Sequence, residues 1–189
     1  AYGNVIEKTN ADGTVNITEY DGLQREKAAY FKSDSNAEKQ ILASTEYEFV
    51  KNHDFDVFTA LNSSSSKSCG GLKTVKKTYI TADKQVVNET LADWKENTVY
   101  EKTNGETKRT NAYYSNGQLA RQTDALGNTI KYEYGTLNKL TKTYTPFNGS
   151  ENYSVTENKY DKNGNIILTK QTVQKEDSST VKYSITQNE

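Results

Sequence analysis

The chain has 189 residues, a formal net charge of −1 and a pI near 6.0, so it lacks the basic surface that a nucleic-acid partner would require. Only 33 % of the residues are hydrophobic, no apolar run is long enough to span a membrane, and a single Cys excludes an internal disulfide framework. The 14 Tyr residues and the abundant Thr residues are good strand formers, and with the low net charge they favour an all-β protein over a disordered chain.

The first part of the chain alternates between strand patterns and turn signals. Residues 4–31 predict three strands, separated by turns at Asp12-Gly13 and Asp21-Gly22. The polar stretch that follows contains Asp34, which is suited to cap a short helix over residues 37–43.

The middle of the chain is less regular. Apolar residues alternate on either side of His53, which predicts a turn there. Residues 62–71 are rich in Ser and Gly and cannot bury enough apolar surface to order themselves, so we expect a mobile loop. Beyond it, Asn-Gly and Gly-Asn turns separate expected strands at 72–81, 85–91, 97–103, 107–114, 118–123, 129–134, 139–145, 152–160, 166–174 and 180–186.

One pattern recurs along the chain. Internal repeats are the sequence signature of repeat folds, so they are considered before any single motif. An aromatic residue is followed four positions later by a turn residue, often Gly, and two positions after that by an apolar residue. The copies are Tyr20-Asp21, Phe49 with His53, Tyr79 with Asp83, Tyr113 with Gly117 and Leu119, Tyr134 with Leu140, and Tyr160-Asp161 with Gly164 and Ile166. A second turn, marked by Asp124, Gly127 and Asn128, follows the copy that starts at Tyr113.

These motifs resemble a known family. Tyr-Asp-x-x-Gly-Asn-Ile at 160–166, Tyr-Asp-Gly-Leu-Gln-Arg-Glu at 20–26 and Asp-Ala-Leu-Gly-Asn-Thr at 124–129 are similar to YD repeats of the Rhs family. The resemblance implies a bacterial protein that is secreted or held at the cell surface. Its repeats would form a β shell around a toxic or effector domain, or a wall-associated stalk.

We therefore expect one all-β segment over residues 1–189, an antiparallel and repetitive sheet of short hairpins that curls or spirals. Residues 1–5 resemble the tail of a further repeat copy, so the main expected partner is the remainder of a larger parent chain. Unpaired strand edges would also favour self-association.

Candidate catalytic and metal-binding residues are few. His53 stands beside Asp54 and Asp56, which would suit a hydrolase or a metal site, but the repeat register places His53 in a turn, where His is tolerated. Cys69 would need a neighbouring base to act as a nucleophile, so we expect an inert thiol. The recurring Asp residues fit turns, where an Asp side chain bonds its own backbone. We expect no enzyme activity, no cofactor and no metal site.

The tyrosines allow two interpretations. Tyr132 and Tyr134 share a strand face with Ile130, which favours cross-strand packing. Solvent-facing tyrosines and Trp94 would instead stack on sugar rings. The first function is therefore a non-catalytic structural repeat segment, and the alternative is a carbohydrate-binding module that contacts cell-wall or host glycans.

Overall fold

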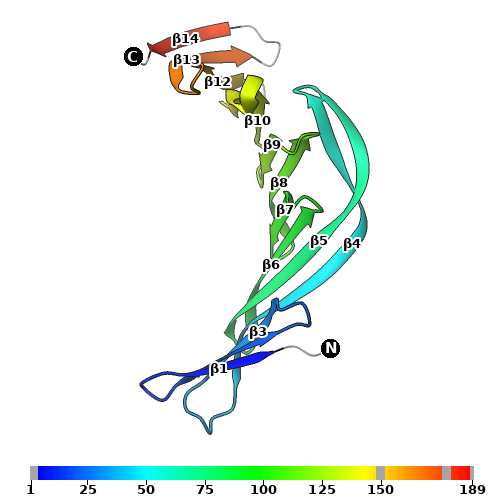
Figure 1. The fold of residues 1–189 in the computed structure, drawn as a ribbon, viewed down its shortest axis with the longest axis vertical. Coiled ribbons are helices and arrows are strands. Elements are labelled where there is room, and N and C mark those ends of the chain that lie inside the picture. Colours follow the sequence, from blue (N-terminus) through cyan, green and yellow to red (C-terminus); the bar gives the residue numbers. More distant parts are fainter. Residues whose placement is uncertain (1–3, 148–151, 176–179, 188–189) are drawn as a thin grey trace. The chain divides into compact units, whose positions relative to one another are not determined.

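The computed structural model describes residues 4–147, 152–175 and 180–187. The chain divides into two compact units, one made of residues 1–52 and 70–107 and the other of residues 53–69 and 108–189. Nearly all of the described elements are strands, β1 to β14, most of which are labelled in Figure 1. No helix in the described ranges is both long enough and apolar enough to cross a bilayer.

Unit 1 is an antiparallel sheet in which neighbouring strands follow the order of the chain. Short turns connect most of these strands, and such turns enforce antiparallel pairing. The buried side chains include Val15, Ile17, Ala28 and Leu91. Its strands are β1 (Val5–Thr9), β2 (Val15–Tyr20), β3 (Glu26–Lys32), the first part of β4 (Gln40–Ala60), the last part of β5 (Ser63–Thr81), β6 (Lys84–Asp93) and β7 (Thr98–Thr103).

Unit 2 contains the last part of β4, the first part of β5 and a second series of antiparallel strands. Its elements are most of β8 (Glu106–Tyr114), then β9 (Leu119–Asp124), β10 (Thr129–Tyr134), the short 3-10 helix η1 (Thr136–Asn138), β11 (Leu140–Pro146), β12 (Asn152–Tyr160), β13 (Ile166–Lys175) and β14 (Thr180–Gln187). Phe58, Ala120, Tyr153 and Val155 are buried here. One parallel contact joins β4 to β8, pairing Val57 with Tyr113 and Phe58 with Tyr114.

The all-β, antiparallel and hairpin-rich fold expected from the sequence is confirmed. The short helix expected over residues 37–43 is wrong. The Asp34 carboxylate does accept backbone hydrogen bonds, from Asn36 at 2.8 Å and Ala37 at 2.9 Å, as a capping residue would. The chain then enters β4 at Gln40, where Ile41 pairs with Tyr30 of β3. Pairing with a neighbouring strand therefore overrides the local capping signal.

The Ser-rich segment also differs from expectation. Residues 63–71 belong to strand β5 and are not a loop. A strand next to β4 satisfies the backbone groups of this segment without burying its small side chains, and the Thr59 hydroxyl lies 3.2 Å from the Ser63 hydroxyl near the hairpin end. The mobility of residues 62–71 stays a prediction.

Candidate functional site

The recurrent local feature is a five-residue turn that begins with an Asp, which we call the Asp turn. Oδ1 of Asp161 accepts the backbone N–H groups of Asn163 and Asn165, both at 2.8 Å. The same pair of bonds, made two and four residues beyond the Asp, occurs at Asp21, Asp93 and Asp124, at 2.8 to 3.0 Å. The side chain thus holds the whole turn, as Asx turns do.

The backbone closes each Asp turn in the same way. The N–H of Asp161 donates to the carbonyl of Asn165 at 2.9 Å, and the N–H of Gly164 donates back to the carbonyl of Asp161 at 3.1 Å. The fourth position has a positive φ, 86° at Gly164 and 85° at Gly127. Glycine suits this position because it lacks a Cβ.

The second carboxylate oxygen is also occupied. Oδ2 accepts the side-chain amide of Asn128 in the turn of Asp124 and that of Asn165 in the turn of Asp161. Arg25 replaces this amide in the turn of Asp21, with its Nε at 2.8 Å. These side-chain bonds, followed by backbone bonds, lower the pKa of the carboxyl groups of Asp21, Asp124 and Asp161. The three carboxylates stabilise turns and are poorly placed for acid–base chemistry.

One Asp turn was missed by sequence reasoning. Asp93-Trp94-Lys95-Glu96-Asn97 closes through the same bonds, with Glu96 at a φ of 65° where the turns of Asp124 and Asp161 have Gly. Without an aromatic residue before it or a Gly inside it, the segment did not match the pattern. The signal that would have found it is the Asp–Asn pair four residues apart, as in Asp124–Asn128.

Two of the proposed copies close without an Asp. In the copy that opens at Tyr113, Tyr114 takes the place of the Asp, Gly117 has a φ of 90°, and Oδ1 of Asn116 accepts the N–H of Gln118. In the copy that opens at Tyr134, Asn138 has a φ of 57° and Leu140 begins β11.

The two weakest copies differ from the pattern. Phe49 and His53 lie within the long strand β4, so the turn expected at His53 is wrong. Local spacing suggested a turn, whereas strand pairing continues through the segment. Tyr79 pairs with Gln85, and a two-residue turn at Ala82-Asp83 connects β5 to β6.

Within the described ranges, no group of three or more His, Cys, Asp or Glu side chains is placed to hold a metal ion. The side chain of Cys69 lies outside the described part of the structure.

Several tyrosines form hydrogen bonds between strands through their hydroxyl groups. Tyr114 donates its hydroxyl to the carbonyl of Tyr132, and Tyr160 donates to that of Leu140, both at 2.7 Å. Tyr144 donates to Glu133 at 3.1 Å, and burial followed by the negative charge of Glu133 raises the pKa of its phenol. These contacts support the packing interpretation for the tyrosines concerned.

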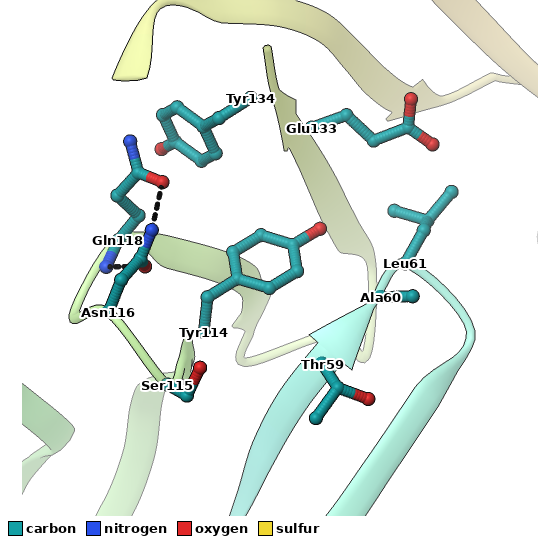
Figure 2. Close-up of a pocket in the computed structure, with 9 residues that line it drawn as sticks. All are labelled: Thr59, Ala60, Leu61, Tyr114, Ser115, Asn116, Gln118, Glu133 and Tyr134. Carbon is teal, nitrogen blue, oxygen red and sulfur yellow. Dashed lines mark hydrogen bonds between the residues drawn. The ribbon is translucent and has the colours of Figure 1, made fainter. Parts of the chain in front are cut away.

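A pocket of about 410 Å³ lies in unit 2, where the end of β4 meets the turn after β8 (Figure 2). The Tyr114 and Tyr134 rings are perpendicular, with centroids 6.1 Å apart, and both line it. The remaining lining includes the amides of Asn116 and Gln118 and the carboxylate of Glu133. The pocket therefore offers aromatic walls together with polar groups, a common composition for small-ligand sites.

The end of the β4–β5 hairpin is fixed to this part of unit 2. Nη2 of Arg121 donates to the carbonyl of Leu61 at 2.8 Å, and its guanidinium lies 4.5 Å from the centre of the Phe58 ring. The backbone N–H of Ser115 donates to the carbonyl of Phe58 at 3.2 Å. These contacts hold one wall of the pocket in place.

Unit 1 carries an exposed aromatic pair. Phe49 and Trp94 stack with centroids 5.9 Å apart, although 57 % and 60 % of their surfaces are exposed. Any Cβ at Gly70 would overlap the Trp94 indole, and the Arg25 guanidinium lies 4.0 Å from the centre of the Tyr47 ring. These aromatic side chains differ from the hydrogen-bonded tyrosines described above because they are exposed to solvent.

Comparison with known proteins supports the family resemblance. Residues 113–150 match the family model described as RHS Repeat. This segment is similar to an RHS repeat. It begins at the aromatic residue that opens the turn of Gly117, and it includes the Asp turn of Asp124. The match supports the resemblance to the structural repeats of Rhs-type proteins over this segment. No curated protein matches the chain.

Proposed function

We propose that the chain is a non-catalytic wall segment of a large Rhs-type bacterial protein, secreted or held at the cell surface. In that protein its repeats would build a β shell around a toxin or effector, or a wall-associated stalk. The observation that carries the proposal is the match of residues 113–150 to the RHS Repeat model. The Asp turn within this segment recurs at Asp21, Asp93 and Asp161.

The physical argument is that the recurring parts stabilise hairpins and present no reactive group. Each Asp turn fixes the connection between two strands with side-chain and backbone bonds, so the sheet grows by adding similar hairpins. Tyrosine hydroxyls then tie one hairpin to the carbonyl of another, as Tyr160 does with Leu140. Such a sheet serves as a wall.

Protection from protease in the larger protein tests this function. We expect the region downstream of the repeats to resist digestion in the full-length protein and to become sensitive when residues 1–189 are deleted. A variant with Asp124 and Asp161 both changed to Ala should show intermediate protection. Identical digestion of the full-length and deleted proteins would contradict the shell function.

A carbohydrate-binding module is the second candidate function, with cell-wall or host glycans as ligands. It is favoured by exposed aromatic surface, namely Phe49 and Trp94 in unit 1 and the tyrosine-lined pocket in unit 2. Sugars commonly bind by placing their apolar C–H face on an aromatic ring. Binding of the whole chain to a panel of immobilised glycans tests it, and absence of binding to every glycan would remove this candidate.

A further inference from the structure

Among the described residues that line the pocket of unit 2, Glu133 is the one with a charged side chain (Figure 2). Its carboxylate accepts the Tyr144 hydroxyl at 3.1 Å, and its charge raises the pKa of both Tyr114 and Tyr144 after the larger effect of burial. Lys142 pairs with Glu133 across the strands, and Arg121 reaches Leu61, but neither cation lines the pocket. Among the described lining residues a ligand therefore meets one negative charge and no positive one, although the charge of Arg121 acts on Tyr114 in the opposite sense to that of Glu133.

The other polar groups of the pocket keep hydrogen-bonding capacity. The Gln118 amide nitrogen has two hydrogens, and its contact with the Asn138 carbonyl at 3.2 Å uses one. The Asn116 amide nitrogen likewise uses one of its two hydrogens, on the Gln118 side-chain oxygen at 2.7 Å. Donors are thus available on the side of the Gly117 turn, and the Glu133 carboxylate is an acceptor that can bind further hydroxyl groups.

We propose that this pocket binds one neutral sugar residue and rejects sugars that carry a carboxylate. The apolar face of a pyranose would lie against the Tyr114 or Tyr134 ring, while its hydroxyl groups, which both donate and accept, would bond the two amides and Glu133. A uronic acid would place its own negative charge near Glu133 in a partly desolvated site, where like charges repel more strongly than in water. This inference rests on the second candidate function and assigns its site and its selectivity.

The experiment compares sugars that differ only in this charge. The full chain, labelled with ¹⁵N, is titrated with glucose, galactose and N-acetylglucosamine, and then with glucuronate and galacturonate, while the side-chain amide signals of Asn116 and Gln118 are followed by NMR. We expect at least one neutral sugar to shift these signals in a saturable way and to bind about tenfold more tightly than its uronic acid.

Three variants locate the binding. Tyr134→Leu keeps apolar volume but removes a ring face, and Gln118→Ala removes an amide; each should weaken binding of the neutral sugar about tenfold. Glu133→Gln keeps an acceptor for Tyr144 and should remove most of the difference between glucose and glucuronate. The matched control is Glu7→Gln, the same change of charge on the exposed strand β1 of unit 1, which does not line the pocket. Dispersed NMR spectra confirm that each variant folds.

The outcomes separate the site from the function. The proposal is supported if the neutral sugar binds more tightly than its uronic acid, and if Glu133→Gln abolishes this selectivity while Glu7→Gln preserves it. If Trp94→Ala abolishes sugar binding and the pocket variants leave it unchanged, the assignment of the site to the pocket is overturned. The second candidate function then still stands. Equal affinity for glucose and glucuronate overturns the selectivity. Absence of binding to all five sugars overturns the assignment of a sugar site to this pocket. Binding to the panel of immobilised glycans then decides whether the second candidate function stands.

Discussion

The fourth position of the Asp turn has a positive φ whichever residue occupies it. Glycine fills it at Gly127 and Gly164, whereas Glu96 holds it at 65°. A residue with a Cβ pays about 1 kcal/mol or more in this left-handed region, so Glu96→Gly should raise the free energy of unfolding by about 1 kcal/mol, less the extra chain entropy of glycine. Gly127→Ala should lower it by a similar amount.

Urea unfolding measures both changes. The matched control is Lys95→Gly, one residue earlier in the same turn, where φ is not positive. Glycine there relieves no positive φ and adds its own entropy cost, so stability should fall. Equal effects of Glu96→Gly and Lys95→Gly would contradict the argument from backbone strain.

The carboxylates of the Asp turns should make stability depend on pH. Hydrogen bonds from Arg25, Asn128 and Asn165 lower the folded-state pKa values of Asp21, Asp124 and Asp161 below their ordinary value. A lowered folded pKa gives stability that is complete above the unfolded pKa and is lost as pH falls through the folded pKa. The urea midpoint of the natural chain should therefore begin to drop below about pH 5 and continue to drop as the pH falls below 3.8, the ordinary pKa of an Asp carboxyl.

The three Asp residues changed together to Asn provide the comparison. Asn keeps an oxygen for the backbone bonds of the turn but does not titrate in this range. The triple variant should lose less stability on acidification than the natural chain. An equal loss would place the acid sensitivity in other carboxylates.

At the level of residues, the sequence was informative where the structure is local. The turns of Asp21, Asp124 and Asp161 depend on contacts within five residues, so their Asp, Gly and Asn signals are readable directly. The turn of Asp93 was missed because no aromatic residue precedes it and it contains no Gly, whereas the turn of Asp21, with Gln24 at the fourth position, follows Tyr20. The pocket was not foreseeable, because Leu61, Tyr114 and Glu133 meet only through the pairing of distant strands.

The hairpin formed by β4 and β5 is the element least visible in the sequence. Its strands contain 21 and 19 residues, whereas the repeat pattern predicted short strands with breaks at His53 and over residues 62–71. Residues with weak strand propensity, such as the Ser run, form a strand here because a long neighbour pairs with them. Strand formation through pairing depends on tertiary context and has no local signal.

Arg121 should control the order of the hairpin end. Arg121→Met keeps the apolar stem but removes the bond to Leu61 and the contact with the Phe58 ring, about 2 kcal/mol of local stability. Amide exchange over residues 57–61 should then rise about thirtyfold. Trypsin, which we expect to cut first at Lys67, should cut there faster. Lys159→Met on β12 is the control and should change neither rate.

At the scale of the whole molecule, the chain contains a single Trp, and it lies in unit 1. Strands β4 and β5 contribute residues to both units, so we propose that residues 1–189 unfold as one segment. The urea transition followed by Trp94 fluorescence should coincide with the one followed by NMR signals of unit 2, such as those of Ala120. Two separate midpoints would show that the units are independent domains.

Strand β1 is the part of unit 1 best suited to contact another chain. It has only β2 as a neighbour among the described strands, and all five of its residues are exposed, including Val5 and Ile6. An unpaired edge with exposed apolar side chains recruits a further strand. In the larger protein the partner would be a neighbouring repeat; for the chain alone we expect a second copy, and hence concentration-dependent self-association.

A charge on this edge should reduce that association. Ile6→Lys introduces the kind of residue with which natural edge strands avoid pairing, and sedimentation should show a dissociation constant about tenfold higher or more. Ile80→Lys is the matched control: Ile80 is 59 % exposed against 57 % for Ile6, but it lies in β5, which has a neighbour on each side. This variant should associate like the natural chain. A strict monomer at high concentration, or equal effects of the two substitutions, would contradict the role of the β1 edge.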